Sequence, residues 1–114
     1  MSDPEPIQRK NGGKLRVDLV PPALIEGAAR ALGHGTEKYR DGDEFNFLRA
    51  YTFRTVYASL IRHLLAWYSG EDTDGESGLS HLDHAAGNLA MLLHYEKTGA
   101  SLDDRPFIGV EPID

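Results

Sequence analysis

The helical spacing of apolar side chains over residues 48–69 constrains the fold of this chain more than any other feature of its sequence. Because an α-helix turns by about 100° per residue, apolar positions three or four residues apart form one stripe along its surface. Arg62 falls opposite this stripe, and Gly70 ends the segment. The stripe comprises Phe53, Val56, Tyr57, Leu60, Leu64, Trp67 and Tyr68. A helix with so broad an apolar face must bury it against other helices, which predicts an all-α fold.

Two further segments carry helical signals of the same kind. Residues 22–39 begin with a proline, which is tolerated in a first helical turn, and the apolar side of this segment comprises Leu24, Ala28, Leu32 and Tyr39. Residues 79–97 precede Gly99, and glycine commonly ends helices. Their predicted core stripe comprises Leu82, Ala85, Ala86, Leu89 and Leu93. The sequence therefore predicts a compact bundle of three main helices.

The two ends of the chain carry weaker signals. Residues 1–13 contain prolines and glycines without an apolar face, so we expect a flexible leader. Residues 14–20 alternate polar and apolar positions, which predicts a short extended segment with Leu15, Val17 and Leu19 turned inward. Residues 100–114 contain two prolines and are predicted to form an extended tail. A chain of 114 residues is expected to form one domain, here a helical domain over residues 14–99.

Composition narrows the possible functions. The chain holds 12 Lys and Arg against 18 Asp and Glu, a formal charge of -6, so we expect no polymeric nucleic acid as a partner. The longest strongly apolar run, residues 64–68, is far shorter than the roughly 20 residues of a membrane-spanning helix. We therefore expect no membrane contact and a cytoplasmic location. The absence of cysteine leaves His, Asp and Glu as the strong metal ligands.

Histidines and carboxylates are concentrated around the connection between the second and third predicted helices. The connection contains four carboxylates: Glu71, Asp72, Asp74 and Glu76. Antiparallel packing of the two helices would bring these acids to one end of the bundle, beside histidines from both helices. The predicted metal ligands are His63, Glu71, Asp74, His81 and His84.

Two interpretations of this cluster stay open. Oxygen ligands favour Mg²⁺ or Mn²⁺, and added imidazole admits Co²⁺, Zn²⁺ or Fe²⁺, so the first interpretation is a divalent metal site. The second is a solvated acidic loop in which Ser77 or Ser80 caps the following helix. The three histidines and Asn88 beside the loop favour the metal site.

Basic and aromatic residues elsewhere predict contacts to a nucleotide. Lys14 and Arg16 follow two glycines, a composition that can meet phosphate through backbone N–H groups and charged side chains. The pairs Lys38-Tyr39 and Asn46-Phe47 each join a polar group to an aromatic ring, which suits a nucleotide base. The alternative for each pair is ordinary turn and core packing.

Taken together, the motifs resemble those of a known family. In chain order they are Gly12-Gly13-Lys14-Leu15-Arg16, Asp18-Leu19-Val20-Pro21-Pro22, Gly35 to Tyr39, Asn46-Phe47, Arg62-His63-Leu64, Gly70-Glu71 to Asp74, Glu76-Ser77-Gly78, His81-Leu82, His84-Ala85 and Asn88. This set resembles the phage dATP/dGTP diphosphohydrolases of the MazZ type. The similarity spans about two thirds of the chain, and residues 62–88 are its most specific part.

The resemblance implies an all-α nucleoside triphosphate pyrophosphohydrolase related to MazG and to dUTPase-type helical enzymes. It further implies an oligomer that uses divalent cations to convert purine deoxynucleoside triphosphates to monophosphates, editing the nucleotide pool in the host cytoplasm. The chain departs from the MazG pattern, which has Glu-x-x-Glu on one helix and Glu-x-x-Asp on the next. Here Glu71 and Asp74 lie in the connection, and His81 and His84 stand where a MazG helix has acids.

From the residues and the resemblance we expect hydrolysis of dATP or dGTP that depends on Mg²⁺, Mn²⁺ or Co²⁺. The expected catalytic groups are Glu71 and Asp74, which hold metal, and Glu76 as general base. The expected substrate contacts are Lys14, Arg16, Lys38 and Arg62 to phosphate, Tyr39, Asn46 and Phe47 to base or sugar, and Asn88.

The sequence also bears on the oligomeric state, and two other functions stay open. The wide apolar face of residues 48–69 predicts a homo-oligomer, either a dimer or a tetramer. One alternative function is a non-catalytic helical module that binds nucleotide or metal or mediates assembly. Another is a structural phage protein of unrelated use.

Overall fold

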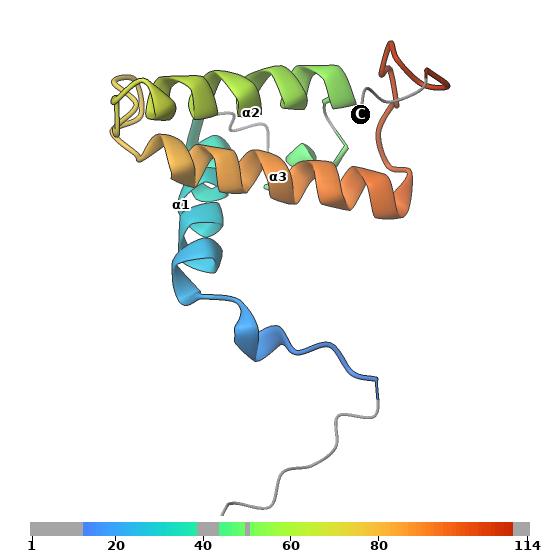
Figure 1. The fold of residues 1–114 in the computed structure, drawn as a ribbon, viewed down its shortest axis with the longest axis horizontal. Helices are drawn as coiled ribbons and strands as arrows, with labels where there is room; N and C mark the ends of the chain where they lie inside the picture. The colour runs from blue at the N-terminus through green and yellow to red at the C-terminus, as the bar shows by residue number, and fades with distance from the viewer. Residues whose placement is uncertain (1–12, 39–43, 50, 111–114) are drawn as a thin grey trace, which may run out of the picture.

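The computed structural model describes residues 13–38, 44–49 and 51–110. They form three α-helices, α1 (Pro22–Lys38), α2 (Phe53–Tyr68) and α3 (His81–Thr98), with short 3-10 helices η1 (Val17–Leu19) and η2 (Asn46–Leu48). Helix α3 packs against both of the other helices. Figure 1 shows α2 and α3 side by side and antiparallel, with α1 crossing behind them. The predicted all-α bundle of three helices is confirmed, and the described residues contain no strand, only an isolated bridge between Thr73 and Ser80.

Local capping explains where the helices begin and end. Helix α2 begins at Phe53, five residues later than predicted, because the Thr52 hydroxyl accepts a hydrogen bond from the Thr55 N–H at 3.3 Å. Ser80 caps α3 in the same way, by accepting from the Leu82 N–H at 3.1 Å. Gly99 adopts a left-handed conformation (φ 67°) and ends α3, as predicted.

The core lies between α2 and α3, with contributions from α1 and η2. Val56, Met91 and Tyr95 are buried, and partly buried side chains pack around them: Leu32, Phe47, Tyr51, Phe53 and Leu92. Tyr95 is fully buried, and its hydroxyl donates a hydrogen bond to the Phe47 carbonyl. Because this bond joins the middle of η2 to α3, it holds η2 against the bundle.

Small residues let α1 approach α3 closely. A Cβ added at Gly87 would stand 2.9 Å from the Ala31 Cβ, and one added at Gly27 would stand 2.7 Å from an Asp83 carboxylate oxygen. The same Asp83 carboxylate accepts a hydrogen bond from the Arg30 guanidinium at 2.8 Å. The crossing is therefore fixed by two glycines and one ion pair.

The predicted core stripe of α3 is wrong in part. Ala85 is buried, but Leu82, Leu89 and Leu93 are 42%, 47% and 50% exposed. The inward side of α3 is instead the one on which His81, Met91 and Tyr95 are buried. The cause is the position of α1 and α2, which both pack on that side of α3. Within the described residues, no further layer covers the leucines on the outer side.

The apolar stripe of α2 is likewise covered only in part. Val56 is buried, whereas Tyr57 and Tyr68 are 59% and 86% exposed, and Leu64 and Trp67 are exposed to a smaller extent. We call the exposed large apolar side chains of the two helices the α2/α3 apolar face; it comprises Tyr57, Leu64, Leu65, Trp67, Tyr68, Leu82, Leu89 and Leu93.

The segment before α1 also differs from its prediction. Residues 14–20 were expected to be extended with their apolar side chains inward, but Leu15, Val17 and Leu19 are exposed and Val17–Leu19 forms a 3-10 turn. The turn forms because the Leu19 N–H reaches the Arg16 carbonyl at 3.1 Å. We call residues 13–20 the arm, and it leads away from the three helices in Figure 1. No part of the bundle therefore lies over its apolar side chains.

The segment after α3 returns to the beginning of α2. The Phe53 N–H donates to the Leu102 carbonyl at 3.2 Å, and the Arg54 N–H donates to the Asp104 carboxylate at 2.9 Å. These bonds satisfy N–H groups that the first turn of a helix leaves without intrahelical partners. The domain boundaries at residues 13 and 99 stay predictions, and residues 1–12 and 111–114 lie outside the described part. Within the described residues, every helix is too short or too polar to cross a membrane.

Candidate functional site

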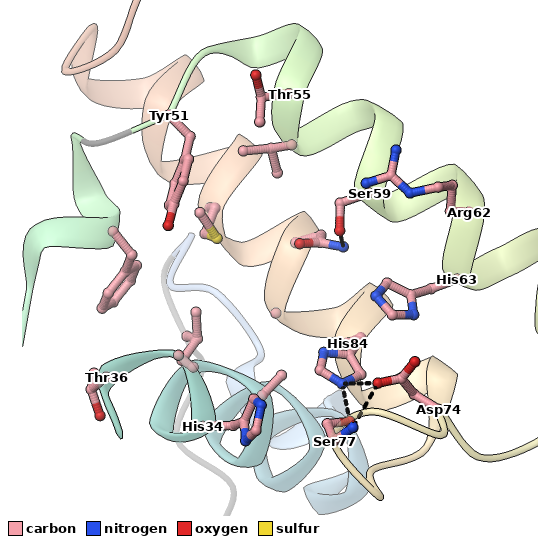
Figure 2. Close-up of a pocket in the computed structure, with 18 of the residues that line it drawn as sticks. His34, Thr36, Tyr51, Thr55, Ser59, Arg62, His63, Asp74, Ser77 and His84 are labelled. Atoms are coloured by element: carbon pink, nitrogen blue, oxygen red, sulfur yellow. Dashed lines mark hydrogen bonds and ion pairs between the residues drawn. The ribbon is translucent and has the colours of Figure 1, made fainter. Parts of the chain in front are cut away.

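A cavity of about 590 Å³ lies between the three helices. Helix α3 contributes His81, His84, Gly87, Asn88 and Met91 to its wall, and α1, η2, α2 and the connection 71–80 complete it. Figure 2 shows His63, Asp74, Ser77 and His84 converging at one end of this cavity, with Tyr51 at the other. The cavity thus has one end rich in histidine and one end lined by the apolar core.

The connection between α2 and α3 is folded tightly, and this places Asp74 at the cavity. The Asp74 N–H donates to the Leu79 carbonyl at 2.8 Å, and the Gly78 N–H donates to the Asp74 carbonyl at 2.8 Å. Gly78 has a φ of +75°, which a side chain would disfavour. The His81 N–H also donates to the Asp72 carbonyl at 2.9 Å, so the loop is joined to the first residue of α3. Antiparallel packing and this loop together produce the cluster that the sequence predicted.

Three of the predicted metal ligands form one compact group. A ring nitrogen of His63, a carboxylate oxygen of Asp74 and a ring nitrogen of His81 all lie within 4.8 Å of one another. The Nδ1 atoms of His63 and His81 are 2.9 Å apart. This is a hydrogen-bond distance, so the two rings are linked to each other and hold their Nδ1 atoms at one point beside Asp74.

His81 carries the clearest sign of a missing partner. The residue is only 5% exposed, and its Nε2 atom is buried without a hydrogen bond in the structure. The nearest charged group to that atom is the Glu71 carboxylate, at 3.5 Å. Buried polar nitrogens nearly always have a partner. When the Nδ1 atom of His81 binds a cation, its Nε2 atom carries the ring proton, and Glu71 is placed to accept a hydrogen bond from it.

His84 is held by different contacts at the same end of the cavity. Its ring stacks on His63 with centroids 4.4 Å apart and planes 9° apart. Its Nε2 atom lies 2.6 Å from the Ser77 hydroxyl and 3.7 Å from the Asp74 carboxylate. The Ser77 N–H donates to that carboxylate at 3.0 Å. Ser77 is therefore hydrogen-bonded to both His84 and Asp74 and holds the two side chains close to each other (Figure 2).

The protonation states of these groups suit metal binding. Burial lowers the pKa of His63, and the neighbouring His84 and His81 lower it further. Burial also lowers the pKa of His84, although Asp74 opposes this effect. Burial by itself would raise the pKa of Asp74, but hydrogen bonds from Ser77 outweigh it and the net pKa is lowered. Near neutral pH the two imidazoles are neutral and the carboxylate is ionised, which are the forms that bind a cation.

The remaining walls are polar near the histidines and apolar further along. The Asn88 side-chain amide donates to the Ser59 hydroxyl at 3.1 Å, which joins α3 to α2. Arg62 lines the cavity close to this pair. The apolar end is lined by Leu32, Phe47, Tyr51, Val56 and Met91. This gradient suits a ligand with a charged end and a flat, less polar end.

The structure brings most of the predicted site residues together. Nine of them line the cavity: Asn46, Phe47, Arg62, His63, Asp74, Glu76, His81, His84 and Asn88. Glu71 is exposed at the edge of the cluster beside His81. Lys38 is the last residue of α1, but its side chain, like all of Tyr39, lies outside the described part of the chain.

Lys14 and Arg16 do not lie at the cavity. Both are on the exposed arm, and Arg16 forms an ion pair with Asp18 at 2.9 Å. Their predicted role at phosphate therefore has no support within a single chain.

Sequence reasoning missed several residues of the site. His34 on α1 places its ring edge-on to His84, with centroids 6.1 Å apart. Ser59 and Ser77 hold two of the predicted residues by hydrogen bonds. No pattern in the sequence relates His34 to Gly87, because the two residues come close only where α1 crosses α3.

Comparison with known proteins places these observations in a family. Residues 4–105 match the family model described as "dATP/dGTP diphosphohydrolase, N-terminal". A protein of Salmonella phage PMBT28 named "dATP/dGTP diphosphohydrolase" is 28% identical over 100 residues, which cover 88% of this chain and 33% of that protein. The chain thus spans about a third of the length of the curated relative that it matches. No solved structure matches the chain.

Proposed function

The chain belongs to the dATP/dGTP diphosphohydrolase N-terminal family, and on this premise we propose that it hydrolyses purine deoxynucleoside triphosphates with the help of a divalent metal ion. The products are the monophosphate and pyrophosphate: water adds to the α-phosphorus, the bond to the bridging oxygen breaks, and pyrophosphate leaves. The observation that carries this proposal is the group of His63, Asp74 and His81 at one end of a cavity large enough for a nucleotide.

The residues present fit a divalent ion. His63, Asp74 and His81 supply two imidazoles and one carboxylate, and Glu71 stands 3.5 Å from the Nε2 of His81, the ring nitrogen that carries the proton when Nδ1 binds an ion. A ligand set of nitrogen and oxygen without sulfur suits Mn²⁺, Co²⁺ or Zn²⁺ better than Mg²⁺, which prefers oxygen alone. A bound ion would supply positive charge to phosphate oxygens and lower the pKa of a water molecule.

The remaining groups of the cavity have separate tasks in this proposal. The Arg62 guanidinium binds phosphate oxygens and offsets the charge that develops on them. Glu76 accepts the proton of the attacking water. At the far end, the base lies among the apolar residues, with Asn46 and Asn88 within the same wall to bond its edge or the sugar.

The assembly of the protein is part of the same proposal. The α2/α3 apolar face leaves Leu82, Leu89 and Leu93 about half exposed, and contact with another chain would remove this apolar surface from water. We propose that a second copy of the chain covers it, giving a homo-oligomer of the dimer or tetramer type.

The test of the activity is direct. We expect release of monophosphate from dATP or dGTP in the presence of Mn²⁺, Co²⁺ or Mg²⁺, and loss of this release after treatment with a chelator. Asp74→Asn should lower kcat by at least about 100-fold, because it removes a charged ligand, and the same variant should no longer be stabilised against heat by added Mn²⁺.

A matched control lies in the same loop. Asp72 is exposed and lies outside the cavity and the metal group, so Asp72→Asn should leave both turnover and metal stabilisation unchanged. Absence of turnover of every purine triphosphate with every ion would contradict the proposal.

One observation favours a second candidate function. The family description names an N-terminal part, and the chain covers only a third of its relative. A helical module that binds nucleotide or metal without hydrolysing it would fit that observation. It predicts calorimetric binding of dGTP or Mn²⁺ by the wild-type chain, with loss of binding in Asp74→Asn, but no product at any enzyme concentration.

A further inference from the structure

The charges that line the cavity are unfavourable for a triphosphate. Among the described side chains in its wall, the carboxylates are Glu44, Asp74 and Glu76, and the single guanidinium is that of Arg62. A nucleoside triphosphate carries several negative charges at neutral pH, and one divalent ion offsets only part of them. The wall of one chain therefore offers such a ligand more repulsion than attraction.

Two cationic side chains lie on the arm, which does not pack against the three helices. Lys14 and Arg16 are on the arm, and no residue of the arm lines the cavity. Three apolar side chains alternate with them along the arm: Leu15 is 87%, Val17 73% and Leu19 69% exposed. An arm that exposes both charge and apolar surface is suited to contact another molecule rather than its own bundle.

The arm is directed away from its own cavity. It joins α1 through Pro21 and Pro22, which fix two backbone φ angles, and the Pro21 carbonyl accepts a hydrogen bond from the Leu24 N–H at 3.0 Å. The cavity wall begins at Ala31, about 14 Å further along the helix axis. To reach its own cavity the arm would have to reverse direction at this stiff junction and run back along α1. Figure 1 shows it running the opposite way.

We propose that the arm of one copy completes the cavity of a second copy, where Lys14 and Arg16 bind the phosphate groups of the substrate. This rests on the proposed function, since the ligand that needs these cations is a nucleoside triphosphate. Arg16 is available for this role because both members of its ion pair with Asp18 are more than half exposed, and such pairs are weak. Burial of Leu15, Val17 and Leu19 against the second copy supplies the apolar contact that the arm lacks in one chain.

Complementation between two defective variants tests the proposal. Lys14→Ala with Arg16→Ala removes the arm cations, and Asp74→Asn removes a metal ligand; each variant by itself should lose turnover of dGTP. When equal amounts are mixed and allowed to exchange subunits, about a quarter of the cavities of a dimer receive an intact arm and an intact wall. About a quarter of wild-type turnover should therefore return. Lys97→Ala, which removes a cation from the last turn of α3, should leave turnover unchanged.

Two results of this experiment would overturn the proposal. Unaltered turnover in the arm variant would mean that its cations do not act at the site. Loss of turnover without recovery in the mixture would mean that the arm acts on its own cavity. If the wild-type chain itself turns over no triphosphate, the proposed function fails, and the contact between copies is decided by the next experiment.

Disulfide trapping tests the contact without any need for activity. The chain has no cysteine, so only introduced cysteines can pair. A chain with Leu15→Cys, mixed with a longer, tagged chain carrying Thr36→Cys at the cavity wall, should form a mixed disulfide under mild oxidation. Lys97→Cys in place of Thr36→Cys should form far less, because that position is at the other end of the bundle. Equal trapping at both positions, or none at Thr36→Cys, would overturn the proposal.

Discussion

The close crossing of α1 and α3 predicts how much alanine at each of two glycines changes the free energy of unfolding. A methyl group added at Gly87 would meet the Ala31 Cβ at 2.9 Å, a distance at which one helix must move. A methyl group added at Gly33, on α1, would meet nothing within 4 Å. Both glycines lie inside helices, where replacement by alanine stabilises by about 0.5–1 kcal/mol through the backbone alone.

The difference between the two variants isolates the cost of overpacking. Gly33→Ala should raise the free energy of unfolding by about 0.5–1 kcal/mol. Gly87→Ala receives the same helical gain but pushes α1 off α3, which costs about 1–3 kcal/mol. Gly87→Ala should therefore be less stable than Gly33→Ala by about 1–3 kcal/mol. Because Ala31 and Gly87 both line the cavity, Gly87→Ala should also raise KM for the nucleotide.

Urea unfolding followed by far-UV circular dichroism, at one fixed protein concentration, measures these differences. A double change provides an internal check, because Ala31→Gly with Gly87→Ala moves the methyl group from α1 to α3. The free energy of unfolding of the double variant should exceed, by about 1–3 kcal/mol, the value obtained by adding the effects of the two single changes. If Gly87→Ala stabilises the protein as much as Gly33→Ala does, the helices do not meet at this point and the reasoning is refuted.

Three further predictions concern the core, pH and assembly. Tyr95→Phe removes the hydrogen bond to the Phe47 carbonyl and should lower the free energy of unfolding by about 1 kcal/mol, whereas exposed Tyr68→Phe should change it little; equal effects would contradict this. Because burial lowers the pKa of His84 below its ordinary value of 6.5, the unfolded chain binds a proton more readily than the folded one. The contribution of His84 to the free energy of unfolding is thus fully present above pH 6.5 and is lost as the pH falls below that value. Urea unfolding at a series of pH values should show this decrease in the free energy of unfolding, and the decrease should be smaller in His84→Asn. Leu89→Glu places a charge in the α2/α3 apolar face and should shift the oligomer towards monomer by light scattering, without loss of helicity; an unchanged mass would contradict the proposed interface.

Helix ends that are set by residues within one turn of the chain could be predicted from the sequence. Helix starts depend on Pro22 and on the hydroxyl of Ser80, and the end of α3 depends on Gly99, all of which act within one turn. The start of α2 was predicted five residues early. The apolar spacing continues before Thr52, but Asn46–Leu48 forms the separate helix η2 and α2 begins only at Phe53. Apolar spacing does not reveal a capped break of this kind.

The candidate site was predictable where neighbouring helices supply it. His63 and His81 flank one short connection, so antiparallel packing of α2 and α3 suffices to bring their Nδ1 atoms to 2.9 Å. His34 was missed because it comes from α1, which is distant in sequence and reaches His84 only through the crossing. The interaction of Lys14 with phosphate stays a prediction, and it now depends on a second copy of the chain.

The sequence by itself determined that this chain forms three helices and that histidines and acids flank one connection, because helix propensity, caps and turn residues act over a few neighbouring positions. Only the tertiary structure decided which side of α3 faces inward. His81 and Tyr95 are buried while Leu89 is half exposed, and hydropathy predicts the reverse for the histidine and the leucine. The physical reason is that burial depends on where α1 and α2 meet α3: Gly87 allows α1 to approach closely, and no other described element covers the leucines on the outer side.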